Sequence, residues 1–127
     1  MWVDKKLHKT RVFHEETVEE GKTLSATIIE LGNSYIILLS EGEENLGTLS
    51  VSIPIKPEIS RLPVSSVLLG ERYVISARSI AERLAAATKK IVLVSVFIKT
   101  VDEMKAGQIF MRLIEKILKK SGERNES

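Results

Sequence analysis

Two segments of the chain, residues 35–40 (YIILLS) and 91–98 (IVLVSVFI), are apolar on both faces when they are read as strands. A strand of this kind is buried on both sides, whereas a strand that alternates apolar and polar residues can leave one face to water. Two other segments, residues 76–90 and 102–120, repeat their apolar side chains with helical periodicity. Two helices of this length cover one face of a sheet and no more. The sequence therefore predicts a sheet whose second face needs a further cover.

The rest of the chain supplies the other strands of this sheet. Alternating or strand-like patterns occupy residues 8–19, 22–31 and 46–53. Polar turns at residues 20–21, 32–34 and 41–44 separate the strands, so the first half predicts a meander of four antiparallel strands. Prolines then mark a long loop at residues 55–63, and a short strand leads from it to the first helix.

These elements predict the fold class and the domain organisation. We expect an α+β domain with an antiparallel sheet of about six strands and two helices on one face, in the order β-β-β-β-(β)-α-β-α. Residues 1–120 are expected to form a single domain and residues 121–127 a disordered tail. Ser76 or a neighbour is expected to cap the first helix, and Thr100 or Asp102 the second.

The second face of the sheet has two candidate covers. The long loop and the first strand could fold over it, or a second copy of the chain could pack sheet on sheet, as in the common twofold-symmetric dimers. We favour the second copy. The residues assigned to this dimer interface come from the two doubly apolar strands and are Tyr35, Ile37, Leu39, Val92, Val94 and Val96.

Composition limits the classes of partner. The 127 residues carry a net charge of +2, and 5% are aromatic, which does not favour nucleic acid. There is no cysteine, no apolar run of membrane-spanning length and no apolar core of a signal peptide near the N-terminus, so we expect a cytoplasmic location. Abundant isoleucine, valine, lysine and glutamate with a single glutamine are typical of thermophilic proteins.

Residues capable of chemistry form no recognisable catalytic set. His8 and His14 fall on one face of a strand but are six residues apart, too far to share a metal ion. The acidic run at residues 15–20 predicts a solvated strand end. Ser65 and Ser66 lie outside any nucleophile motif, and the lone Gly70 before a helix is a weak signal for anion binding. We predict no enzyme activity, no metal and no cofactor.

One stretch of sequence resembles a known family. Residues 63–70 (PVSSVLLG), the helix core at residues 80–85 (IAERLA), the turn at residues 88–90 (TKK) and the buried strand that follows are similar to the type 3 and type 4 proteasome-assembly chaperones, and to type 4 especially. The type 4 helix core begins with leucine, where this chain has Ile80. The resemblance is strongest over residues 63–98.

This resemblance implies a function. The family consists of small α+β proteins that are not enzymes, act as dimers and bind α-type subunits of the 20S core particle during ring assembly. The eukaryotic proteins form a heterodimer, whereas this short chain with a thermophilic composition is expected to be an archaeal-type homodimer. The surface expected to bind the α subunit adjoins residues 63–70 and comprises Lys56, Glu58, Arg61, Glu71, Arg72 and Tyr73.

Other readings of the sequence remain open. The chain could be a dimeric scaffold or interaction module with a different protein partner. It could also be a small-molecule binding domain that uses the helix N-terminus near Gly70. An enzyme is the least supported class, because no nucleophile, base or metal set is matched.

Overall fold

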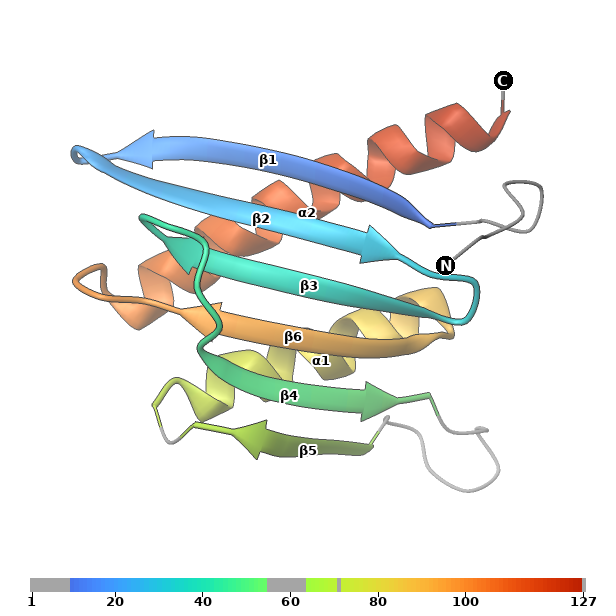
Figure 1. The fold of residues 1–127 in the computed structure, drawn as a ribbon, viewed down its shortest axis with the longest axis horizontal. Coiled ribbons are helices and arrows are strands. Elements are labelled where there is room, and N and C mark those ends of the chain that lie inside the picture. Colours follow the sequence, from blue (N-terminus) through green and yellow to red (C-terminus); the bar gives the residue numbers. More distant parts are fainter. Residues whose placement is uncertain (1–9, 55–63, 71, 127) are drawn as a thin grey trace, which may run out of the picture.

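The computed structural model describes residues 10–54, 64–70 and 72–126, and they form a six-stranded sheet with two helices packed on one of its faces (Figure 1). The strands are β1 (Arg11–Glu19), β2 (Lys22–Glu30), β3 (Ser34–Glu41), β4 (Thr48–Ile53), β5 (Val64–Leu69) and β6 (Ile91–Phe97). The helices are α1 (Val74–Thr88) and α2 (Glu103–Glu126). The predicted α+β class, element order and one-sided helix layer are confirmed.

The sheet order is β1-β2-β3-β6-β4-β5, which corrects the predicted meander. The first three strands pair as antiparallel neighbours, as expected. Strand β6 then inserts between β3 and β4, parallel to β3 and antiparallel to β4. The two most apolar strands therefore become the two central neighbours, where each is covered on both edges and its apolar side chains are buried most completely.

The core lies between the sheet and the helices. The aliphatic side chains of β2, β3 and β6 that point toward the helices are between 0% and 2% exposed, including Leu24, Leu39 and Val94. They pack in one cluster with apolar residues of α1 and α2, such as Ile80 and Phe110. Alternation along each strand then fixes which side chains point away from the helices.

The start of α1 differs from prediction, whereas one of the two residues predicted to cap α2 is confirmed. Helix α1 begins at Val74 rather than near Ser76, and Tyr73, in the left-handed region at φ 60°, precedes it without a side-chain cap. The Ser76 hydroxyl donates to Glu103 instead. Asp102 caps α2, where its carboxylate accepts the N–H of Lys105 at 3.2 Å.

Helix α2 also continues to Glu126, where a disordered tail was expected from residue 121. The side chain of Ser121 is 5% exposed, and its hydroxyl donates to Glu30 at 3.1 Å. Arg11 contacts the same carboxylate at 2.6 Å. This contact joins α2 at Ser121 to the β1–β2 pair, so the helix still packs on the sheet at the point where the tail was expected to begin.

Candidate protein-interaction surfaces

The face of the sheet opposite the helices, called here the open face, carries a row of apolar side chains. The register pairs Val12 with Ile29, Ile29 with Ile36, Ile36 with Leu93, and Leu93 with Val51, so the row crosses five strands. Ile29, Ile36, Leu93 and Val51 are half-buried, and Val12 is 63% exposed. A continuous apolar row of this kind on a sheet face is typical of a surface that binds another protein.

The residues predicted for the dimer interface lie on the other face of the sheet. Ile37, Leu39, Val92, Val94 and Val96 are at most 2% exposed and belong to the core beneath the helices. Tyr35 packs against the same core, with the Lys90 ammonium 5.0 Å from its ring centre. The sequence did not show which alternate residues of these strands face the helices, because a doubly apolar strand gives no signal of which face the helices cover.

The first strand does not cover the open face. Strand β1 is an edge strand of the sheet, paired with β2. The connection between β3 and β4 crosses in front of one end of β6 (Figure 1). There Asn45 and Ser40 are joined by hydrogen bonds of 3.3 and 3.4 Å. This connection covers one end of the face and leaves the apolar row beside it.

A polar cluster adjoins the apolar row. His14 on β1 lies with Nδ1 2.7 Å from the Thr27 hydroxyl and 3.3 Å from Glu44, and with Nε2 3.0 Å from Glu16. The Thr27 hydroxyl donates to Glu44. The nearby Ser25 hydroxyl is buried and has no hydrogen-bond partner among the described residues. The open face thus has an apolar centre and a polar, partly acidic end.

The surface predicted to bind a proteasome subunit is described in part. Lys56, Glu58, Arg61 and Glu71 lie outside the described residues. Arg72 is exposed, and its guanidinium lies 5.2 Å from the centre of the Tyr73 ring.

Both side chains line a hollow of about 350 Å³ between the ends of β4, β6 and the start of α1. Gly70, at φ +93°, also lines it, and the Thr48 hydroxyl donates to the Arg72 carbonyl oxygen. A Cβ at Gly70 would lie 2.5 Å from that hydroxyl, so this glycine permits a close packing contact. Its packing role accounts for the glycine without a bound anion.

The acidic run on β1 connects the sheet to α2. Glu15 contacts Lys120 at 2.7 Å and Lys116 at 3.1 Å, and these hydrogen bonds lower its pKa. Glu20 contacts Lys105 at 2.8 Å, and its pKa is lowered for the same reason. The run was predicted to be a solvated strand end, but Glu15, Glu19 and Glu20 have basic partners on α2, and Glu16 contacts His14.

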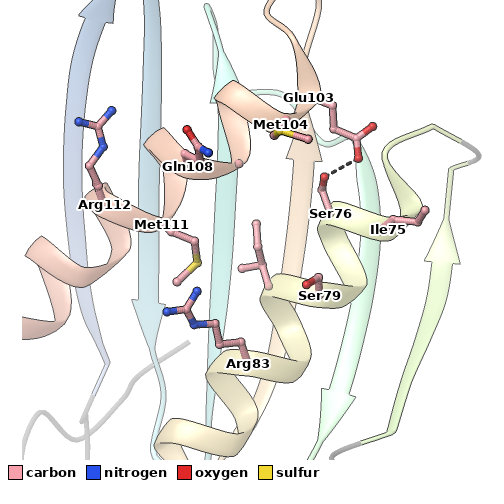
Figure 2. Close-up of a pocket in the computed structure, with 11 residues that line it drawn as sticks. Ile75, Ser76, Ser79, Arg83, Glu103, Met104, Gln108, Met111 and Arg112 are labelled. Carbon is pink, nitrogen blue, oxygen red and sulfur yellow. Dashed lines mark hydrogen bonds between the residues drawn. The ribbon is translucent and has the colours of Figure 1, made fainter.

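A groove between α1 and α2 was missed at the sequence level. Its volume is about 570 Å³, and Figure 2 shows the residues that line it. Met104 and Met111 of α2 point toward α1, and Arg83 of α1 points toward Met111 (Figure 2). The spacing of Met104 and Met111, seven residues apart on a helix, places them on one face and was the available signal.

Two kinds of site are absent from the part of the chain that the structure describes. It holds no group of three or more histidine, aspartate or glutamate side chains placed to bind a metal ion. Nor does any of its helices combine the length and the apolar character needed to cross a membrane. The features that remain are surfaces: the open face, the Arg72–Tyr73 hollow and the helix groove.

A helix-backed sheet with an exposed apolar face defines a protein-interaction module. Comparison with known families makes the class specific: residues 23–98, more than half of the chain, match the family model described as proteasome assembly chaperone 4. The chain belongs to this family. The matched range runs from β2 through β6, so α2 lies beyond it.

Solved structures give a second comparison. The fold is similar to a chain in the "Crystal Structure of a Novel Chaperone Complex for Yeast 20S Proteasome Assembly", with a TM-score of 0.63 and 14% sequence identity. The similarity covers 89% of this chain and 95% of that chain. At this identity the likeness shows the fold alone. No curated protein sequence matches the chain.

Proposed function

We propose that this chain is a non-catalytic chaperone of proteasome assembly that forms a homodimer through its open face and binds 20S α subunits. Membership of the proteasome assembly chaperone 4 family supports the chaperone role. The observation that carries the dimer is the apolar row of the open face, which runs through Ile29, Ile36, Leu93 and Val51.

The physical reason for the dimer is the cost of leaving this row in water. Burying apolar surface contributes roughly 25 cal/mol for each Å² removed from water. Two sheets that pack face to face bring such rows together at a spacing of about 10 Å. In a twofold-symmetric pair the apolar row of one copy packs against the same row of the other copy, so both rows are buried in one interface.

The α-subunit surface is proposed at the Arg72–Tyr73 hollow. Lys56, Glu58, Arg61 and Glu71, which lie outside the described residues, stay part of the proposal from the sequence. Arg72 supplies an exposed cation and Tyr73 an aromatic side chain, two residue types enriched among interface hot spots. None of the apolar-row residues Ile29, Ile36, Leu93 and Val51 lines this hollow, so the two proposed surfaces use different residues. A cytoplasmic location stays a prediction.

The dimer is tested with Leu93→Glu, which places a charge at the centre of the apolar row. Light scattering after size-exclusion chromatography should report a dimer for the natural chain and a monomer for this variant. Met104→Glu is the matched control, because Met104 is 74% exposed on the helix side and lies outside the open face. A natural chain that is monomeric at micromolar concentration would refute the dimer.

The α-subunit surface needs its own variants. Arg72→Glu should weaken co-elution with recombinant proteasome α subunits, while the variant remains dimeric and folded by circular dichroism. Tyr73→Phe is the matched control, because it keeps the ring packed against the core and under Arg72. Co-elution that is unaffected by Arg72→Glu would exclude this hollow, and a natural dimer that ignores every α subunit would favour the scaffold alternative.

A further inference from the structure

We propose that the groove between α1 and α2 is a second docking site, which takes a short apolar segment of another protein that carries a carboxylate. The groove lies on the helix side of the molecule, away from the open face (Figures 1 and 2). The proposal therefore does not rest on the dimer or on the α-subunit surface.

The apolar part of the groove has an exposed edge and a buried floor. Ile80 of α1 is 5% exposed and forms part of the floor, whereas Met104 of α2 is 74% exposed. Gly107 lines the groove between the two methionines, and a Cβ at this position would meet no atom within 4 Å. The missing side chain leaves open space in a helix where alanine would be more stable.

Methionine makes such a surface adaptable. Its unbranched side chain and polarisable sulfur let it follow the shape of different apolar partners. The volume of about 570 Å³ falls within the usual range of roughly 300 to 1,000 Å³ for binding pockets. The groove therefore has room for several apolar side chains of a bound segment.

The charges at the groove determine the chemistry of the occupant. At one end, the Glu103 carboxylate already accepts the Ser76 hydroxyl (Figure 2). At the other end, the Arg83 guanidinium lies 3.9 Å from Glu115, and the two side chains are 68% and 61% exposed. An exposed pair at this distance contributes little to stability, so Arg83 can exchange it for a better carboxylate partner.

A carboxylate on a bound segment would satisfy Arg83 with two parallel hydrogen bonds, the geometry that arginine favours. Three lysines of α2 have carboxylate partners on β1 or in the turn after it: Lys105 with Glu20, and Lys116 and Lys120 with Glu15. Arg112, which also lines the groove, lies 4.0 Å from Glu19. Arg83 is thus the cation that points into the groove from α1, and it places the acidic group of the occupant beside Met111.

The test uses two short synthetic peptides with the same leucine pattern, one with glutamate and one with lysine at its polar positions. Binding is followed by NMR of carbon-13-labelled methionine methyl groups, with the signals of Met104 and Met111 assigned by Met→Leu variants. The glutamate peptide should shift both signals and bind at least tenfold more tightly than the lysine peptide, because a charge reversal beside one arginine changes affinity by about this factor.

Three variants of the full-length chain separate charge from packing. Arg83→Glu should weaken binding of the glutamate peptide about tenfold and strengthen binding of the lysine peptide. Lys22→Glu makes the same change of charge in β2, outside the groove, and should leave both affinities unchanged. Gly107→Ala, which fills open space between the methionines, should weaken both peptides while α2 stays folded.

Three results would overturn the proposal. The first is unshifted Met104 and Met111 signals with the glutamate peptide. The second is equal affinity for the two peptides, which would show a purely apolar groove. The third is a change of both signals on dilution without peptide, which would show that a second copy occupies the groove.

Discussion

Replacing Glu41, the last residue of β3, should remove a large part of the stability of the fold. The side chain is 5% exposed, and Oε1 accepts the backbone N–H groups of Lys99, Thr100 and Val101 at 2.8–2.9 Å. Oε2 accepts the Thr100 hydroxyl at 2.6 Å. This one carboxylate therefore binds three consecutive residues, 99–101, of the connection from β6 to α2.

The magnitude follows from the pKa of Glu41. Burial raises this pKa, but the Thr100 hydroxyl and the three N–H donors together lower it from 4.5 to about 2. A lowered pKa in the folded state means that the contribution to stability is complete above pH 4.5 and is lost as the pH falls toward 2. Each pKa unit corresponds to 1.36 kcal/mol, so the contribution at pH 7 is roughly 3 kcal/mol.

Glu41→Gln keeps an acceptor oxygen and loses the charge, so it should lower the free energy of unfolding by about 3 kcal/mol at pH 7. The difference from the natural chain should shrink steadily between pH 4.5 and pH 2. Glu41→Ala should cost more, because each buried N–H without an acceptor costs a further ~1–3 kcal/mol. Glu43→Gln, in the exposed turn two residues on, is the matched control and should change stability by less than about 0.5 kcal/mol.

Urea denaturation followed by circular dichroism, at one fixed protein concentration and several pH values, measures these differences. A difference between Glu41→Gln and the natural chain that stays constant from pH 5 to pH 2.5 would refute the reasoning. A loss of less than about 1 kcal/mol at pH 7 would also refute it, because a pKa lowered this far in the folded state requires a larger loss of unfolding free energy when the charge is removed.

Other substitutions test the packing directly. Gly47→Ala should destabilise the fold by about 3 kcal/mol or more, because its Cβ would lie 2.1 Å from the Val96 carbonyl oxygen and backbone atoms must move. Gly122→Ala, in open space on α2, should instead raise the free energy of unfolding by about 0.5–1 kcal/mol, and both are measured by urea denaturation. Glu15→Gln should lower the free energy of unfolding by less than about 1 kcal/mol in the same urea assay, and the effect should weaken in high salt.

Much of the architecture was readable from periodicity, but the position of β6 was not. Residues 91–98 indicated a buried strand, since both faces are apolar. That pattern reports burial and contains no information on which strands become neighbours, so the insertion between β3 and β4 depends on the tertiary fold. The pattern also did not show which face of the strand the helices cover. For this reason the expected dimer interface included Ile37 and Val94, which are buried beneath the helices.

Long-range polar contacts were equally invisible. Glu41 was assigned to a polar turn, because acidic residues and a glycine follow one another there. Its partners, Lys99 to Val101, lie 58–60 residues further along the chain, and nothing local marks a glutamate as an acceptor for them. The family, in contrast, was recognisable from residues 63–98, which fall entirely within the matched range of 23–98.

The insertion of β6 has a consequence for the order in which the chain can fold. As the protein is synthesised, β1–β3 can form a complete antiparallel unit, and β4 and β5 can pair as a second unit. The two units cannot join until β6 emerges, because each offers β6 an unpaired edge and they share no pairing of their own. A nascent chain that has not reached Ile91 therefore presents two open strand edges, the kind of surface that promotes aggregation. A protein that guides the assembly of others thus depends, in its own folding, on one late strand.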